Sequence, residues 1–323
     1  MPVPLNRGYP VSWAARLRGL TPADDNLRPD GESSPSPAAE PDSGQTVVFI
    51  CGLHRSGTTP LSRWLGEHPS ISRLADTGAP EDEGQHLQTA VPTAKAHGGA
   101  GVFAFDPHAH LTEVSPLANA STRKHLWDAW SPYWDTTKPI LLEKSPPNVV
   151  RTRFLQALFP DAAFVGVIRH PIAVAYATRR INKSLSIDRL FRHWLHATDQ
   201  FLRDAQALNR VMLVRYEDLI TRPGEQLSRI FDFLEVEPFE HDWAVQGTHN
   251  DRYFDRWNAG RRNVVKHARQ RTLRRRFEKD FGEFGYRLAP TPGTGEPGSA
   301  AIRSLLPDTS PLPQPTSSTL SPS

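Results

Sequence analysis

The sequence predicts an α/β fold in which helices cover both faces of a central parallel sheet, giving three layers. Short apolar runs rich in β-branched residues alternate with segments of helical character along the middle of the chain. This alternation is typical of parallel sheets. The runs are apolar along their whole length, as expected of strands buried on both faces. A glycine-rich turn follows the first run, at the edge of the sheet where such folds bind ligands.

Four strands are predicted from the apolar runs. The first run, TVVFI, precedes the glycine-rich turn, and the third, AAFVGVI, is the cleanest of the four. The second, PILL, and the fourth, VMLV, are shorter and lie between segments of helical character. In order, the strands are expected at residues 46–50, 139–142, 162–168 and 211–214. The loops after the first three should therefore lie at one edge of the sheet.

Helices are predicted between and after these strands. Pro171 marks the start of one helix, because proline suits the first helical turn, and Pro160 closes the helix before it. The helices are expected at residues 60–67, 121–134, 148–158, from 171 onward, 185–208, 223–234 and 261–281. The stretch 76–115 is rich in Gly, His and acidic residues and is predicted to be mostly loop, with a short helix opening at Pro80.

Apolar side chains at helical spacing indicate which helix faces are buried. Trp127, Trp130 and Trp134 fall on one face, and burial in the core is favoured over a role in an acceptor pocket. The apolar positions of the basic helix at 261–281 include Val265, Leu273 and Phe277.

Composition predicts one structured domain between two disordered segments. Residues 28–43 and the tail from residue 289 are rich in Pro, Ser and Gly and lack periodic apolar residues. We therefore expect a disordered N-terminal segment at 1–44, a domain at 45–288 and a disordered tail at 289–323. The arginine-heavy, proline-rich composition suggests a bacterial source with a GC-rich genome.

Cysteine content, hydropathy and charge indicate the cellular compartment and the kind of binding partner. Cys51 is the only cysteine in the sequence, which excludes an internal disulfide and suits a reducing compartment. The sequence has no apolar run of signal-peptide or membrane-span length, so a cytoplasmic location is expected. The formal net charge of +3 is mild, and no aromatic-basic motif for nucleic acid occurs. We therefore expect the positive charge to serve an anionic small-molecule partner and not nucleic acid.

The turn after the first strand, GLHRSGTT, has the shape of a phosphate-binding loop. Gly52 is followed by four residues and then by Gly57, but Thr58 stands where a nucleotide triphosphatase has lysine. Such a turn points backbone N–H groups at one spot, at the positive end of a helix dipole, which suits phosphate or sulfate. Arg55 inside the turn can grip two oxygens of one anion. The sequence therefore predicts a P-loop-like anion site.

The same residues resemble the 5′-phosphosulfate-binding loop of the sulfotransferases, whose usual form is Pro-Arg-Ser-Gly-Thr-Thr. His54 replaces the proline here, as is compatible with bacterial members of the family. The family uses 3′-phosphoadenosine 5′-phosphosulfate (PAPS) as donor. The resemblance implies that the 5′-phosphate and the sulfuryl group are held by Arg55, Ser56, Gly57, Thr58 and Thr59.

A second stretch, IRHPIAVAYATRR at 168–180, resembles the element of this family that binds the 3′-phosphate. Arg169 matches the arginine of that element at the end of a strand. The serine of the element would fall at Ala177, so that contact is missing, and Thr178 is the possible substitute one position on.

Two further stretches extend the resemblance to residues 46–285. LVRYEDLITRPGEQL, at 213–227, resembles the segment whose tyrosine approaches the adenine, which implies that role for Tyr216. LLEKSPPNVVRTRFLQALFP, at 141–160, is similar to bacterial members in particular. Arg261 and Arg262 are candidates for closing the site at the 3′-phosphate, as basic residues from this end do in many members.

The implied reaction is an in-line displacement at sulfur, in which an acceptor hydroxyl attacks and the nucleotide phosphate leaves. Arg55 and Lys144 are the candidates for stabilising the bridging oxygen. The alternative for Lys144 is a surface lysine that pairs with Glu143. An acceptor hydroxyl also needs a base. The segment TGAPEDEGQHLQ and the aspartate just before it supply the candidates, which in order of preference are Glu83, Glu81, Asp76 and His86. Acids after Pro80 also suit an ordinary helix N-terminus.

No metal is expected, and the acceptor is expected to be a hydroxylated small molecule, carbohydrate, lipid or peptide. His193 and His196 have helical spacing but no further ligand nearby in sequence, which favours a helix-surface position. The segment 98–110 is expected to wall the acceptor side. Two alternatives remain: a P-loop kinase or nucleotide hydrolase with Glu143 as its magnesium acid, and an inactive nucleotide-binding relative, for which Ala177 is the evidence.

Overall fold

The structure is a computed structural model that describes residues 44–239, 250–259 and 264–288. These residues belong to one compact unit of the chain. Both segments that the sequence predicts to be disordered lie outside them, except for Gly44, as do Arg261 and Arg262. Within the described part, five parallel strands form one sheet in the order β2-β3-β1-β4-β5. Their bounds are β1 Thr46–Cys51, β2 Ile71–Arg73, β3 Ile140–Lys144, β4 Ala163–Ile168 and β5 Val211–Arg215.

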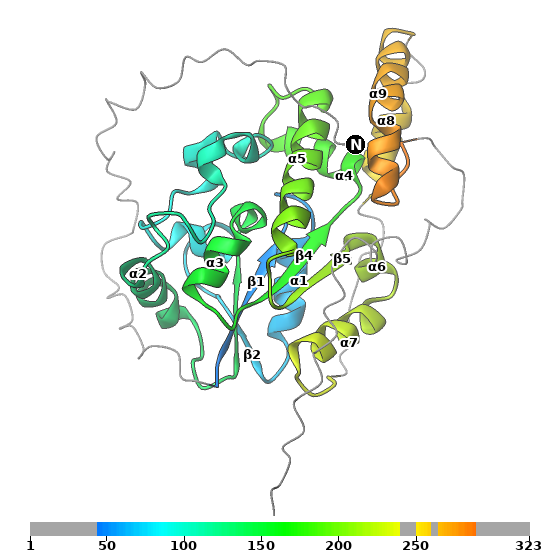
Figure 1. Ribbon diagram of the computed structural model, residues 1–323. Helices are drawn as coiled ribbons and strands as arrows, with labels where there is room; N and C mark the ends of the chain where they lie inside the picture. Colours follow the sequence, from blue (N-terminus) through cyan, green and yellow to red (C-terminus); the bar gives the residue numbers. More distant parts are fainter. Residues whose placement is uncertain (1–43, 240–249, 260–263, 289–323) are drawn as a thin grey trace, which may run out of the picture. The chain divides into compact units, whose positions relative to one another are not determined.

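Helices follow the strands as the sequence predicts, with short 3₁₀ turns filling the stretch between β2 and α2. Their bounds are α1 Thr58–Gly66, α2 Ala120–Trp130, α3 Thr152–Leu158, α4 Pro171–Ile181, α5 Ile187–Ala205, α6 Tyr216–Thr221, α7 Pro223–Leu234, α8 Asp251–Ala259 and α9 Val264–Glu283. In Figure 1, α8 and α9 lie beside α4 and α5, which they contact.

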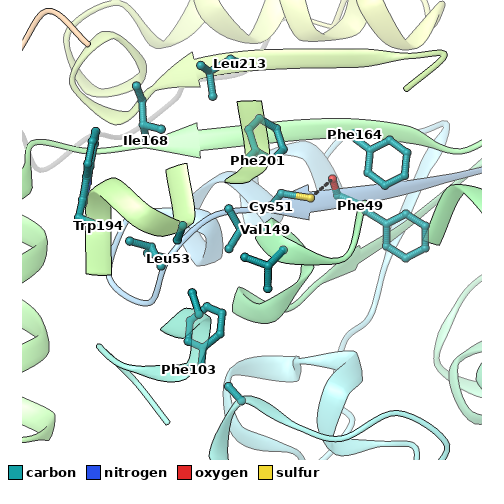
Figure 2. Close-up of a cluster of buried hydrophobic side chains, with 14 of the residues drawn as sticks. Phe49, Cys51, Leu53, Phe103, Val149, Phe164, Ile168, Trp194, Phe201 and Leu213 are labelled. Atoms are coloured by element: carbon teal, nitrogen blue, oxygen red, sulfur yellow. Dashed lines mark hydrogen bonds between the residues drawn. The ribbon is translucent and has the colours of Figure 1, made fainter. Parts of the chain in front are cut away.

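Helices cover both faces of the sheet, which confirms the predicted three-layer α/β architecture. Side chains alternate along a strand, so Phe49 of β1 belongs to the core under α2, α3, α4 and α5, whereas Ile50 belongs to the core under α1, α6 and α7. Figure 2 shows the first core, where the ring of Phe49 of β1 lies beside that of Phe164 of β4, with centroids 5.6 Å apart, and Cys51 lies near Phe201 of α5. The three tryptophans expected in the core are buried there.

The strand order positions the loops that the sequence singles out. β1 pairs with β3 on one side and with β4 on the other, both in parallel. The ends of these three neighbouring strands therefore meet at one edge of the sheet, as predicted. Gly166 allows α5 to pack closely on β4, because a Cβ at this position would lie 2.6 Å from the ring of Phe201.

Some elements differ from the expectation. β2, α6 and α8 are present but not predicted, and the helix expected at 148–158 begins as a 3₁₀ turn over Pro146–Val150. Of the apolar positions of the basic helix, Leu273 and Phe277 are buried, whereas Val265 is 78% exposed.

Candidate active site

The anion loop between β1 and α1 is held by a hydrogen bond within it, and its glycines leave no room for a side chain. The Ser56 hydroxyl donates to the carbonyl of Leu53 at 2.6 Å. A Cβ on Gly52 would lie 2.7 Å from both Ser56 Oγ and the carbonyl of Val167. Gly57 has φ of 104° and is the N-cap of α1, a conformation that glycine adopts without strain. The free N–H groups of the first turn of α1 thus begin at this loop.

Gly57 also makes room for an aromatic ring, which gives a first prediction. A Cβ at this position would lie 2.2 Å from Cδ2 of Tyr216. Replacing Gly57 by Ala should therefore lower the free energy of unfolding by about 1–3 kcal/mol, through backbone strain and displacement of the ring. Urea denaturation measures this change. Gly224→Ala is the control, because Gly224 has no atom within 4 Å of the added carbon and no positive φ; an equal loss in both variants would contradict the argument.

Arg169, at the end of β4, joins the loop to the rest of the site. Its guanidinium carbon lies 4.2 Å from the centre of the Tyr216 ring, and the same ring lies close to Gly57. Nη1 donates to the carbonyl of Arg55 at 3.0 Å, and Nε and Nη2 donate to Oδ1 of Asn250 at 2.9 and 2.6 Å. Three of its five N–H donors are used in this way, and the other two donate to no described residue. Burial lowers the pKa of Arg169, with nearby Tyr216 and Glu217 opposing the shift.

A buried carboxylate anchors this arrangement. Glu217 Oε1 accepts from Asn250 Nδ2 at 3.0 Å and from the backbone N–H of His170 at 2.9 Å. Its Oε2 accepts from the hydroxyl of Tyr286 at 3.1 Å. Glu217 therefore holds Asn250 on Arg169 and ties the segment after α9 to the end of β4.

A cavity of about 760 Å³ opens in front of the loop and Arg169. We call it the donor cavity, after the role that the sequence resemblance implies for its loop. Among the residues expected from the sequence, those that line it are Arg55, Gly57, Thr58, Thr59, Glu81, Arg169 and Tyr216. Sequence reasoning missed its further basic and aromatic lining: Arg63, Trp64, Arg180, Arg252 and Tyr253. Helical spacing was an available signal, since Arg63 lies one turn after Thr59 in α1 and Arg180 one turn after Ala177 in α4.

Two residues expected at the donor do not line this cavity. Ser56 is buried within the loop, where its hydroxyl donates to the carbonyl of Leu53. Thr178 is buried on another side of α4, and its methyl group faces Gly101. Ala177, at the position where the serine was expected, lines the cavity and packs against Tyr253 of α8. The wall that lacks the serine hydroxyl is therefore built from Tyr253 and Arg252, whose Nη2 donates to the Tyr253 hydroxyl at 2.8 Å.

Lys144 and Glu83 form a buried ion pair at the end of β3. Lys144 Nζ lies 3.2 Å from Glu83 Oε1 and donates to the carbonyl of Glu81 at 2.9 Å. The Lys144 side chain is 3% exposed and that of Glu83 11%. The alternative of a surface lysine paired with Glu143 is wrong, because successive strand residues point to opposite faces. Glu81 lines the donor cavity together with Arg55, so the ion pair lies next to that cavity's wall.

Glu83 is held in its ionised form. Burial alone would raise the pKa of its carboxyl, but the interaction with His86, the charge of Lys144 and the hydrogen bond from Gln85 outweigh burial and lower the pKa from 4.5. His86 Nε2 lies 3.6 Å from Glu83 Oε2, which is longer than a hydrogen bond. Asp76 is exposed and does not line the donor cavity. Of the candidate bases, Glu83 alone is buried.

Glu143 holds the Glu83 segment on the sheet. Its Oε1 accepts from the backbone N–H of Gly84 at 3.0 Å and from the Ser145 hydroxyl, and its Oε2 accepts from Asn148 Nδ2. A Cβ on Gly84 would lie 2.6 Å from Glu143 Oε1, so only glycine permits this approach. Burial raises the pKa of Glu143, against the opposing effect of its Ser145 and Asn148 hydrogen bonds.

Glu143→Gln should destabilise the fold. The carboxylate accepts three hydrogen bonds, and a glutamine would turn an N–H₂ group toward one of these donors. We expect a loss of about 1–3 kcal/mol in the free energy of unfolding, measured by urea denaturation. Glu113→Gln is the matched control, since Glu113 pairs with Arg153 at the surface and exposed pairs contribute at most about 1 kcal/mol. A Glu143 variant as stable as this control would contradict the anchoring role.

Two histidines near the site, His54 and His193, are buried and have lowered pKa values. Burial lowers the pKa of His54 to about 4; Glu83 opposes the shift, and Arg55 and Lys144 add to it. The His54 ring contacts Phe103 edge to face, with centroids 5.7 Å apart, so the segment 98–110 packs over the loop. His193 accepts from the backbone N–H of Ala104 at 3.2 Å and is buried. The helix-surface position expected for His193 is therefore wrong.

Neither a metal cluster nor a membrane span is found among the described residues. No group of three or more His, Cys, Asp or Glu side chains there is arranged to hold a metal ion. Within the same residues, every helix is too short or too polar to cross a bilayer.

A family model matches the part of the chain that contains the loop, Arg169 and Tyr216. Residues 47–241 match a family model described as the sulfotransferase family. The chain is 23% identical over 233 residues to a protein-tyrosine sulfotransferase of Drosophila melanogaster, covering 66% of this chain and 41% of that protein. It is 24% identical over 219 residues to nodulation protein NoeE of Sinorhizobium fredii, covering 59% of this chain and 50% of that protein. The chain thus spans half or less of the length of these two relatives.

Among solved structures, the sulfotransferase domain from the Synechococcus PCC 7002 olefin synthase is 21% identical, with a TM-score of 0.43. This likeness covers 66% of this chain and 89% of that one.

Proposed function

Since the chain belongs to the sulfotransferase family, we propose that it moves a sulfuryl group from PAPS to a hydroxyl acceptor by in-line displacement. One observation carries the proposal: a cavity lined by the anion loop and several arginines lies against a buried Glu83–Lys144 ion pair. The cavity supplies the charges that bind a nucleotide bearing two phosphates. The ion pair supplies a base and a cation for the transfer.

The donor is assigned by the charges and rings of the donor cavity. Arg55 and the backbone N–H groups at Gly57, Thr58 and Thr59 hold the 5′-phosphosulfate. Arg169 holds the 3′-phosphate, and Tyr216 presents a ring face to the adenine. Because Ala177 lacks a hydroxyl, we assign Arg180 and Arg252 to the 3′-phosphate in place of Thr178, since both line this cavity.

The chemistry follows from the pair at the end of β3. Glu83 accepts the proton of the acceptor hydroxyl while the acceptor oxygen forms its bond to sulfur. The bond between sulfur and the bridging phosphate oxygen breaks, and adenosine 3′,5′-bisphosphate leaves with the electron pair. Lys144 and Arg55 stabilise the charge on the bridging oxygen. Before the reaction, the Lys144 ammonium keeps Glu83 ionised and therefore ready to accept a proton.

The kinase alternative would need Glu143 to bind magnesium. Both carboxylate oxygens of Glu143 instead accept hydrogen bonds, from Gly84, Ser145 and Asn148. Thr58 lines the donor cavity at the position where such an enzyme has lysine. Both observations favour a sulfuryl donor over a nucleoside triphosphate.

Binding and transfer test the proposal together. Titration calorimetry of the full chain should show one site for adenosine 3′,5′-bisphosphate and weaker binding of ATP. Transfer of labelled sulfate from PAPS is then screened across phenols, sugars, lipids and tyrosine peptides by mass spectrometry. The tyrosine peptides are included because a relative is named as a protein-tyrosine sulfotransferase. Binding without transfer to any acceptor would favour the inactive relative, and magnesium-dependent ATP turnover would favour the kinase.

The acid side of the pH profile identifies the base. With Glu83 as base, turnover should fall only as pH drops through its lowered pKa, below 4.5, because the carboxylate is ionised at every higher pH. A histidine acting as base would instead give a fall near pH ~6.5. Measuring kcat/KM, which reports the ionisations of the free enzyme, from pH 4 to 8 separates the two. A fall near neutral pH would remove Glu83 from this role.

A further inference from the structure

A second hollow, of about 860 Å³, lies between α4, the start of α5, α8 and α9. We call it the basic cavity, because its lining includes six cationic side chains: Arg179, Arg180, Lys183, Arg256, Lys266 and Arg269. No carboxylate occurs among the described residues that line it. None of the roles in the proposed transfer uses it, apart from Arg180, which also lines the donor cavity.

One face of α4 and one face of α9 line this hollow. From α4 the lining residues are Tyr176, Arg179, Arg180 and Lys183, the last just past the helix end, and from α9 they are Lys266, Arg269, Gln270 and Leu273. Both sets follow the spacing i, i+3, i+4, i+7, which places residues on one helix face. The cations of the two sets therefore face a common space, with Arg256 of α8 beside them.

Three arginines of this lining lack the acidic partners that some cations on other described helices have. Arg203, for example, pairs with Asp199 and Lys124 with Asp128, each one helical turn away. Among the described residues, no acid forms an ion pair with Arg179, Arg256 or Arg269. Burial raises the pKa of the nearby Tyr176 hydroxyl, and the positive charges of these same three arginines oppose that shift. Like charges around one space repel, so an anion in the space would relieve an existing repulsion.

We propose that the basic cavity binds a compact, multiply charged phosphate or sulfate ester at a site separate from the donor. Guanidinium groups bind the oxygens of such esters in pairs. The volume is within the range of small-molecule pockets, about 300–1,000 Å³. Because Arg180 serves both cavities, occupancy of the basic cavity weakens binding in the donor cavity, and the reverse effect has the same size.

Titration calorimetry of the full chain with tripolyphosphate as probe tests this site. The titration is run with the donor cavity saturated by adenosine 3′,5′-bisphosphate, and again in the Arg55→Ala variant without nucleotide. One tripolyphosphate should bind per chain in both experiments. In the double variant Arg256→Gln, Arg269→Gln, the affinity should fall at least tenfold. The matched control, Arg271→Gln with Arg275→Gln, removes the same charge from α9 outside the lining and should change affinity by less than threefold.

Several results would overturn the assignment. Equal losses in the two double variants would mean diffuse attraction to a basic surface. Loss of tripolyphosphate binding in Arg55→Ala, or its complete displacement by nucleotide, would mean that the probe occupies the donor cavity only. A glutamate decapeptide that binds tenfold more tightly than tripolyphosphate, with the same sensitivity to Arg256 and Arg269, would make the ligand an acidic peptide instead. None of these results depends on sulfuryl transfer, so the site and the proposed function fail separately.

Discussion

Replacing Arg55 by Ala should abolish measurable transfer from PAPS while the chain remains folded. Arg55 lies in the anion loop with φ of 70° and lines the donor cavity. Its backbone carbonyl, which alanine keeps, accepts the bond from Arg169, so the loop retains its anchor. Loss of one charge-stabilising group at a transition state lowers kcat by about 10²–10³. We expect at least this loss, measured as initial rates at saturating donor.

Arg63→Ala is the matched control for Arg55. Arg63 lies on α1 and lines the same cavity, but it lies outside the anion loop. Its loss should weaken nucleotide binding modestly and leave kcat within about tenfold of the wild-type value. Circular dichroism and urea denaturation check that both variants fold. A folded Arg55 variant with wild-type kcat would overturn the role of the loop in the transfer.

Replacing Glu83 by Gln should lower turnover far more than donor affinity. The amide keeps the size of the side chain but cannot take up the acceptor proton, and loss of a general base lowers kcat by about 10²–10⁴. Adenosine 3′,5′-bisphosphate should still bind within about threefold, because Arg55, Arg169 and Tyr216 are unchanged. Titration calorimetry for the nucleotide and steady-state kinetics for transfer measure the two quantities.

Glu81→Gln separates the two acids of this turn. Glu81 contacts Lys144 through its backbone carbonyl, which the substitution leaves in place, so turnover should stay near the wild-type value. If Glu81→Gln lost turnover and Glu83→Gln kept it, the base would be Glu81. If both variants kept it, no carboxylate of the turn would act as the base.

The sheet and most helices could be predicted because their signals are local. β1 and β4 are apolar runs of six residues between glycine or proline punctuation, and strands buried on both faces leave such runs. β2 could not be predicted, because its three residues, Ile71–Arg73, are too few to show a period. α8 begins with Asp251 and has only Tyr253 and Trp257 as buried residues, a weak apolar pattern. Its position depends on contact with α4, which no local pattern shows.

The candidate site was predictable where one short motif carries it and less so where distant segments meet. The loop from Gly52 to Thr59 could be located from glycine spacing alone. The partner of Lys144 could not, because Glu83 reaches it only when Gly84 docks on Glu143, across a separation of 59 residues. Asn250 on Arg169 is a meeting of the same kind. Such polar contacts depend on tertiary packing and leave no periodic signal.

The family match ends at residue 241, yet Asn250, Arg252 and Tyr253 complete the wall around Arg169. A fragment cut after α7 would retain the glycine turn and the Glu83–Lys144 pair but would leave two arginine nitrogens without their amide partner. Under the proposed donor assignment, exchanging the segment after α7 would alter only the side of the 3′-phosphate site that Asn250 and Arg252 supply, while Arg169 and the anion loop stayed in place. The cavity is thus assembled from two parts of the chain, of which only the first lies within the family match.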